Sequence, residues 1–259
     1  MNLKEVKTIK EKVDGLVVSP LDKGGKRLWV QCPVRVAAGL EKFVLGDPNF
    51  QVSDLKADEA LKSIKDLYEC CGINSLMDYR EGKLPHVRID PKFKSPNEKY
   101  RLITSYYSFP CKRVLRFAGS ALRFMLSEVH KHGKMTSFTL FKLNDFKERI
   151  LELKRLPNKK KLKVWQNDVK CMFTHLSKDG ILAKVSRLIA LYQDIHRGKP
   201  KGITVDCKSR ECFNGISLAI EGTIDLEFDM IRRIVLFDLS STFSRLGDIV
   251  LFQMEGLPI

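Results

Sequence analysis

The sequence predicts an α+β protein in which helices back an antiparallel sheet. Apolar residues recur with the helical period over residues 3–13, 53–71, 110–130, 143–156, 178–196 and 225–239. Short apolar runs bounded by turn residues predict strands at residues 16–18, 27–30, 86–89, 100–104, 161–168, 202–206 and 248–253. Several of these runs are joined by short turns, which favours antiparallel pairing.

Two of the predicted hairpins carry cations. The first surrounds Asp22-Lys23-Gly24-Gly25, a turn whose backbone N–H groups can face a phosphate, although a plain turn is the simpler alternative. The second spans residues 84–105, with Lys92 and Lys94 on one arm and Arg101 on the other. A cationic arm of this kind suits a triphosphate, and an ordinary lysine-rich surface hairpin is the alternative.

Capping residues, prolines and glycines predict where the helices begin and end. Ser53 is a candidate cap for the helix that stops at Gly72, and Pro110 suits the first turn of the longest helix. Ser177 is expected to cap the helix that ends before Gly198. The basic run at residues 159–161 is the most plausible domain boundary, which divides the chain into regions 1–160 and 161–259.

The composition favours a polyanionic partner. The 259 residues include 44% hydrophobic residues, which excludes a disordered chain, and the formal net charge is +15. Nucleic acid is the leading partner, with an anionic membrane surface or a merely solvated basic surface as alternatives. No apolar run approaches the roughly 18 residues of a membrane span, so no membrane-spanning segment is expected, and with nucleic acid as the leading partner no membrane is expected among the partners.

The cysteines and histidines give no enzyme or metal signature. Seven cysteines without a Cys-x-x-Cys pair favour reduced thiols in an intracellular protein, in the nucleus or the cytoplasm. The histidines and cysteines lack the paired spacing of a zinc site. The phosphate-binding loop of P-loop NTPases is also absent from the sequence.

Asp168 is the candidate metal ligand. It ends the apolar run at residues 161–168, and a carboxylate at the end of a strand projects from the rim of a sheet. Magnesium prefers such oxygen ligands, and Phe173 follows five positions later. An aspartate that merely ends a strand is the alternative.

Four motifs in order resemble those of reverse transcriptases, the RNA-directed DNA polymerases of retroelements, with Penelope-like enzymes the nearest subclass. They are the Asp-Lys-Gly-Gly turn at residue 22, Lys94 with Arg101 seven positions on, Asp168 with Phe173, and Gln253-x-x-Gly256-x-Pro258. Leu102 stands where many members have proline. The resemblance implies a right-hand polymerase fold. Residues 1–160 would form a helical and hairpin fingers region with its basic hairpin at 84–105, and residues 161–259 the amino-terminal part of a palm.

The resemblance also implies a role for each site residue. Asp168 and the backbone carbonyl of Val169 would hold magnesium, with two ions in the complete enzyme. The dNTP would contact Lys94, Arg101, Phe173 and Gln253, and Phe173 would exclude ribonucleotides. The RNA template and DNA primer would contact Lys92, Arg113, Arg116, Gly256 and Pro258.

The resemblance stops before one motif of the family. Reverse transcriptases carry two further carboxylates in a Tyr-x-Asp-Asp hairpin, and this sequence contains no adjacent aspartates. We therefore expect the rest of the palm and the thumb to belong to a longer protein, or the chain to be a degenerate copy, and we expect the isolated chain not to polymerise. A non-catalytic nucleic-acid-binding module derived from a retroelement is the main alternative. A structural protein that meets an acidic partner is the third.

Overall fold

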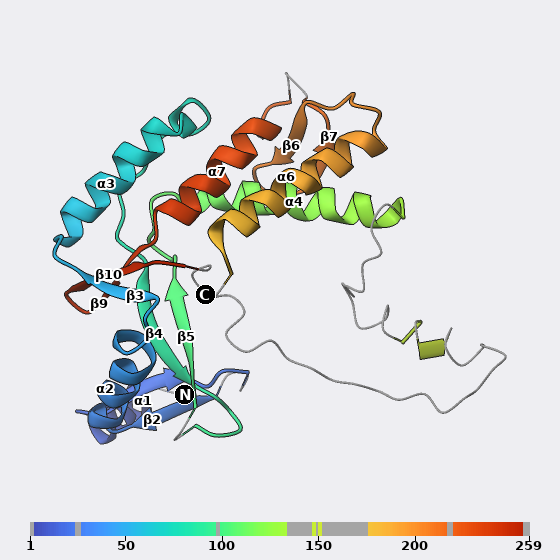
Figure 1. The fold of residues 1–259 in the computed structure, drawn as a ribbon. Coiled ribbons are helices and arrows are strands. Elements are labelled where there is room, and N and C mark those ends of the chain that lie inside the picture. Colours follow the sequence, from blue (N-terminus) through green and yellow to red (C-terminus); the bar gives the residue numbers. More distant parts are fainter. Residues whose placement is uncertain are drawn as a thin grey trace.

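The computed structural model describes residues 3–23, 27–96, 99–133, 147–148, 150–151, 176–216 and 220–255, and it shows an α+β protein (Figure 1). The helices are α1 (Leu3–Lys12), α2 (Pro33–Leu40), α3 (Ala57–Cys70), α4 (Lys112–Lys131), α6 (Lys178–Ile195) and α7 (Phe228–Ser240), with short helical turns at Glu41–Leu45 and Ile73–Ser75. The strands are β1 (Val17–Pro20), β2 (Leu28–Gln31), β3 (Phe50–Ser53), β4 (His86–Pro91), β5 (Tyr100–Ser105), β6 (Gly202–Asp206), β7 (Cys212–Asn214), β8 (Thr223–Glu227), β9 (Phe243–Leu246) and β10 (Ile249–Gln253).

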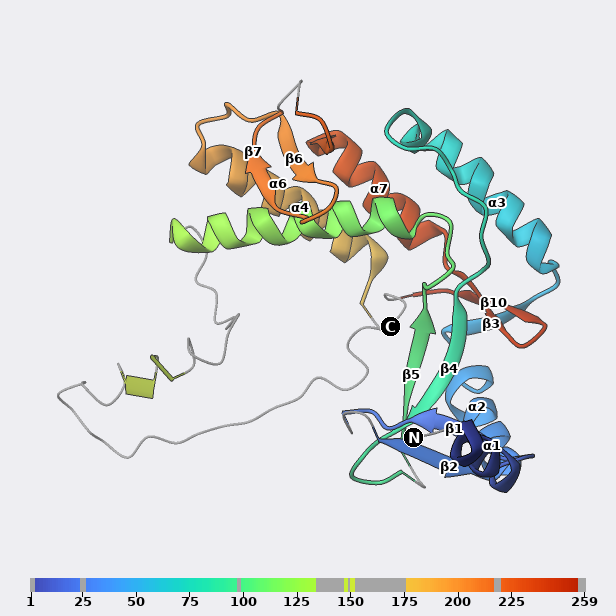
Figure 2. The same ribbon diagram turned by 180° about the vertical axis from the view of Figure 1, so that it is seen from behind.

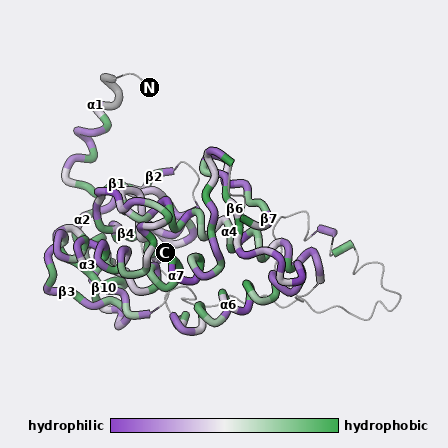
Figure 3. Tube along the Cα trace, turned by 90° about the horizontal axis from the view of Figure 1, so that it is seen from above, coloured by the Kyte–Doolittle hydropathy of each residue, from purple (hydrophilic) through white to green (hydrophobic). Residues whose placement is uncertain are grey.

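The two predicted basic hairpins are confirmed and lie next to each other. Strands β1 and β2 pair antiparallel, as do β4 and β5. The Asp22 backbone N–H donates to the Pro91 carbonyl at 3.0 Å, which joins the turn of the first hairpin to the second. Helix α1 extends away from the packed elements in the view of Figure 3.

The main sheet has the strand order β3-β10-β9-β4-β5. Its neighbouring strands are antiparallel except β4 and β9, which meet in parallel at His86 and Arg245. The sheet therefore contains strands from both sides of the predicted boundary at residue 160, which itself lies outside the described residues. In Figure 1 this sheet lies below the layer of helices.

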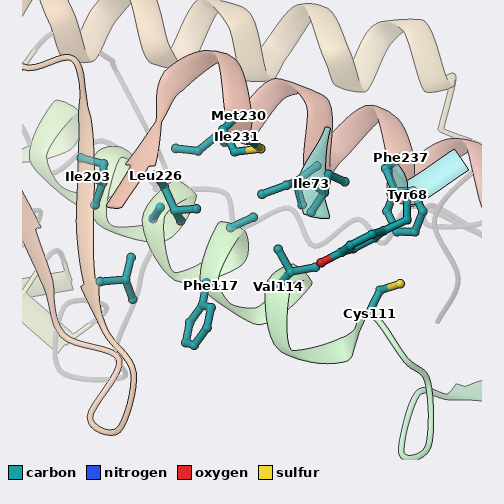
Figure 4. Close-up of a cluster of buried hydrophobic side chains, with 14 of the residues drawn as sticks. Tyr68, Ile73, Cys111, Val114, Phe117, Ile203, Leu226, Met230, Ile231 and Phe237 are labelled. Atoms are coloured by element: carbon teal, nitrogen blue, oxygen red, sulfur yellow. The ribbon is translucent and has the colours of Figure 1, made fainter. Parts of the chain in front are cut away.

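Helices α4, α6 and α7 pack together beside the small sheet β7-β6-β8. Figure 4 shows part of their shared core, in which Ile203 and Leu226 from the small sheet and Ile231 from α7 are fully buried. Helix α3 joins this core through Tyr68, whose ring meets the Phe237 ring edge-on at 5.4 Å. Burial of these apolar side chains is the main force that holds the helical layer together.

Most predicted helices are confirmed; α1 and α6 begin where expected, and α3, α4 and α7 begin a few residues later. Ser177 caps α6 as expected, because its Oγ accepts from the Gly180 backbone N–H at 3.3 Å. Ser53 does not cap α3, since it lies in β3. The helix begins after Lys56, whose N–H donates to the Glu59 carboxylate at 2.7 Å. The helix predicted at 143–156 and the strand at 161–168 lie mostly or wholly outside the described residues.

The sequence did not predict strands β3, β7, β8 and β9 or helix α2. The helix expected from residue 225 begins at Phe228, because residues 223–227 pair with β6 as strand β8. The pairing is close at Gly202, where an added Cβ would lie 2.3 Å from the Leu226 carbonyl oxygen. Any larger residue there would separate β6 from β8, which explains the glycine.

Asp238 makes the stability of the helical layer depend on pH. Burial raises the pKa of this α7 carboxyl to about 6. Burial also raises the pKa of Tyr106 and of Cys111, and the Asp238 charge raises both further. The folded state thus favours the protonated acid. The contribution to stability is present below the ordinary pKa of 3.8 and is lost as pH rises through about 6.

We therefore expect Asp238→Asn to stabilise the protein at pH 8 by about 2 kcal/mol and to have little effect at pH 4. Urea unfolding of both proteins from pH 4 to pH 8 measures the difference. The exposed Asp229 on the same helix, changed to asparagine, is the control and should give no such trend. An Asp238→Asn protein that is less stable than the parent at pH 8 would show that the carboxylate has a stabilising partner.

Candidate nucleic-acid interface

The β4–β5 hairpin presents its cations near its tip. Lys92 and Lys94 are exposed, and the Lys92 backbone N–H donates to the Lys99 carbonyl at 2.8 Å, which closes the hairpin beyond β4. Arg101 lies opposite Asp90 in the strand register. Lys92, Lys94 and Arg101, which the sequence predicts as nucleotide or template contacts, therefore occupy the same end of the hairpin.

Asp22 holds the Arg101 side chain. Its Oδ1 lies 3.0 Å from Arg101 Nη1, and the side chains keep 13% and 38% of their exposure, respectively. The Arg27 guanidinium also lies over the Phe93 ring, 5.2 Å from its centre. The structure thus brings together two motifs that the sequence offers separately, the Asp-Lys-Gly-Gly turn and the Lys94–Arg101 hairpin. No pattern in the sequence predicts this ion pair.

Gln253 lies buried at the end of β10. Its Nε2 donates to the Glu255 carbonyl at 2.7 Å, and its own carbonyl accepts from Thr242 Oγ1 at 2.6 Å and Lys178 Nζ at 3.3 Å. Desolvation lowers the pKa of Lys178, and the Glu255 carboxylate opposes this. The end of β10 is therefore tied to the start of α6, and the Gln253 amide already has a partner within the chain.

The structure does not bring Gln253 to Lys94 and Arg101. Gln253 pairs with Thr242, and β9 joins β4 at its first residue, the open end of the hairpin. Arg101 lies on the outer strand near the tip. At about 3.3 Å per residue and 4.8 Å per strand, the two backbone positions are roughly 20–30 Å apart across the sheet. In this arrangement only the hairpin residues form one cluster.

Helix α4, which follows β5 in the chain, presents a row of arginines. Arg113, Arg116 and Arg123 are exposed, whereas the opposite side of the helix is buried in the core. The helix has five lysines and arginines and a single carboxylate, Glu128, which is held by Lys131 at 2.7 Å. The exposed side of α4 is therefore strongly positive. In Figure 2 the helix lies in front of α6, along the whole helical layer.

The metal and ribose predictions fall outside the described part of the chain. Asp168, Val169, Phe173, Gly256 and Pro258 are not among the described residues. In the ranges that the structure does describe, no three His, Cys, Asp or Glu side chains are close enough to hold a metal ion. A magnesium site therefore depends on Asp168 and stays a prediction.

Comparisons with known proteins assign no family to this chain. A scan against models of protein families finds no match, and a search of curated proteins finds no significant similarity. Over the described residues, none of the helices has the length and apolar character needed to cross a bilayer. The described cysteines, at positions 32, 70, 71, 111, 207 and 212, are free thiols.

Proposed function

We propose that this chain forms the fingers region and the first part of the palm of a retroelement reverse transcriptase. In that role it binds an RNA template, a DNA primer and a dNTP for template-directed transfer of nucleotides to the primer 3′-hydroxyl. The observation that carries the proposal is the main sheet, which joins the Lys94–Arg101 hairpin to the strand that ends on Gln253. Two of the four ordered motifs are thus parts of one structure.

The charge distribution supports the same function. The hairpin cations and the exposed arginines of α4 follow each other along the chain, and both belong to a protein of net charge +15. Lysine and arginine contacts to phosphates provide most of the affinity for nucleic acid and fix its position without reading its sequence. A template or primer backbone that passes α4 would meet Arg113 and Arg116 first.

Asp168 and the Val169 carbonyl are the residues proposed to hold magnesium. When bound, two such ions activate the attacking 3′-oxygen and stabilise the departing pyrophosphate. The described residues have a different proposed role, which is to bind phosphates. The hairpin neutralises phosphate charge, and α4 holds the backbone of the template and primer.

A second function is favoured by the state of Arg101 and Gln253. Arg101 is paired with Asp22, the Gln253 amide is bound within the chain, and the two residues lie at opposite ends of the sheet. These features fit a basic module that binds nucleic acid without a nucleotide site. Both functions predict binding to nucleic acid, and only the polymerase predicts an added effect of dNTP.

Removal of the first two α4 arginines tests the shared part of the proposal. We expect Arg113→Ala with Arg116→Ala to weaken binding of a labelled primer–template by about tenfold and to lower the slope of log affinity against log salt by about 2. Fluorescence anisotropy between 50 and 300 mM NaCl gives both quantities.

Arg187→Ala is the matched control, because Arg187 is an exposed arginine within helix α6. We expect it to change the salt slope much less than the α4 pair. Equal losses in the control and in the α4 variant would mean that net charge alone governs binding. That result would favour a general polyanion-binding protein over a shaped interface.

A further inference from the structure

A hollow lies between α4 and the turn that joins β6 to β7. It has a volume of about 440 Å³, and its lining includes Ser120, Arg123, Phe124 and Ser127 from the helix and Ser209 and Arg210 from the turn. Figure 2 shows α4 and β7 side by side at this part of the molecule, and α4 contacts both β6 and β7.

The helix supplies one continuous polar row. Arg113, Arg116, Ser120, Arg123 and Ser127 follow at spacings of three and four residues, which places them on one side of α4. The opposite side carries the buried Val114, Ala118, Ala121 and Met125. The hollow is therefore the continuation of the Arg113–Arg116 surface toward the carboxyl end of the helix.

The turn is held in one shape by its own hydrogen bonds. The Asp206 carboxylate accepts from the backbone N–H groups of Lys208 at 2.8 Å and Ser209 at 2.6 Å, and from Ser209 Oγ at 3.0 Å. These bonds hold the pKa of Asp206 below its usual value. Arg210 then adopts a left-handed conformation with φ of 65°. The backbone thus fixes the position from which Arg210 reaches the hollow.

The hollow has positive charge without a carboxylate in its lining. Its charged lining residues are Arg123 and Arg210. Neither forms an ion pair with a carboxylate of the described chain, unlike Arg88, Arg101 and Arg233. Of the two carboxylates at this turn, Asp206 accepts the turn's own hydrogen bonds, and Glu211, next to Arg210, is exposed and does not line the hollow. Two guanidinium groups without a carboxylate partner in the described chain, in one lining with serine hydroxyls, have the chemistry that suits an oxyanion.

We propose that this hollow binds a backbone phosphate of the nucleic-acid strand that runs along α4. The inference rests on the proposed function, since it extends the Arg113–Arg116 contact. Arg116 and Arg123 are two helical turns apart, or about 10.5 Å, which corresponds to about three nucleotides of a stacked strand. The guanidinium groups donate to phosphate oxygens, and the hollow reads no base.

The test uses substitutions that preserve the local backbone. Arg123→Gln keeps a good helix former in α4, and Arg210→Asn keeps a residue that tolerates the left-handed conformation. We expect the double variant to bind a labelled 20-nucleotide strand about tenfold more weakly and to lose about 2 from the salt slope. The loss should be equal for two unrelated base sequences. Arg187→Gln is the control, and thermal unfolding verifies that the variants fold.

The outcomes separate this inference from the proposed function. Unchanged affinity in Arg123→Gln with Arg210→Asn, together with weaker binding in the Arg113 and Arg116 variant, would overturn the phosphate site and keep the α4 interface. A wild-type protein that binds no oligonucleotide would overturn both. Titration with inorganic phosphate completes the test. If inorganic phosphate binds the wild type and loses affinity in the double variant while oligonucleotide affinity stays unchanged, the ligand is a free phosphate and the proposal is wrong.

Discussion

Replacement of Phe237 by alanine is expected to lower the free energy of unfolding by about 4 kcal/mol. The ring is fully buried in the last turn of α7, and it meets the Tyr68 ring edge-on at 5.4 Å. It therefore joins α3 to α7, across the region where α3 meets the helical layer in Figure 4. Truncation removes the buried ring and leaves a cavity that the packed neighbours cannot fill.

Urea unfolding followed by circular dichroism measures this loss. Phe213→Ala is the matched control, because the same side chain on β7 is 47% exposed. We expect the control to cost well under half as much, since little apolar surface would be returned to water. A similar loss for both variants would mean that the α3–α7 junction contributes little to the stability of the fold.

Most of the helices could be predicted from the sequence because each depends on its own local pattern, whereas α2 was not predicted. The apolar positions of α4, including Val114, Ala118 and Met125, recur at the helical period, and the structure buries them. The cap at Ser177 is likewise a local signal. Strands β8 and β9 depend on partners far along the chain. The local pattern predicts a helix from residue 225, whereas residues 223–227 pair with β6 as a strand. Strand β3 becomes part of the main sheet only through β10, about 200 residues later.

The candidate interface likewise has local features that the sequence predicts and long-range contacts that it does not predict. The cations of the 84–105 hairpin and the exposed arginines of α4 follow from composition and periodicity, because both are local features. The Asp22–Arg101 ion pair joins residues from two hairpins, and the hollow at Arg123 and Arg210 joins a helix to a turn nearly 90 residues away. No spacing in the sequence indicates such contacts. They arise from the packing of the elements, which only the three-dimensional arrangement shows.

Replacement of Arg101 by alanine is expected to weaken binding of magnesium–dNTP to the complex with primer–template by about 30- to 100-fold, if the chain holds a nucleotide as proposed. Charge-assisted hydrogen bonds to phosphate are worth about 1.5–3 kcal/mol each, and a guanidinium can make two in parallel. Asp22 occupies only one of the five N–H donors of Arg101, through Nη1. The remaining donors are oriented by that pair and can face a triphosphate.

Asp22→Asn distinguishes the effect of the Asp22 charge on nucleotide binding from the effect of its hydrogen bond with Arg101. The amide oxygen can still accept from Arg101, while the negative charge that opposes a triphosphate is gone. We therefore expect dNTP to bind about threefold more tightly to this variant. The rise in melting temperature with dNTP concentration, at fixed primer–template, reports the affinity. Lys99→Ala is the control, because it removes an exposed cation from the same hairpin without touching Asp22.

The combined Asp22→Asn and Arg101→Ala variant tests whether the Asp22–Arg101 ion pair belongs to a nucleotide site or only joins the two hairpins. Arg101→Ala alone leaves the Asp22 carboxylate unpaired at 13% exposure, so part of its effect is a loss of stability. The combined variant removes that cost. If it regains stability but still fails to respond to dNTP, Arg101 is a nucleotide contact. If neither the parent nor any variant responds to dNTP while all bind primer–template, the pair only holds the two hairpins together. The chain is then a basic nucleic-acid-binding module whose interface is α4.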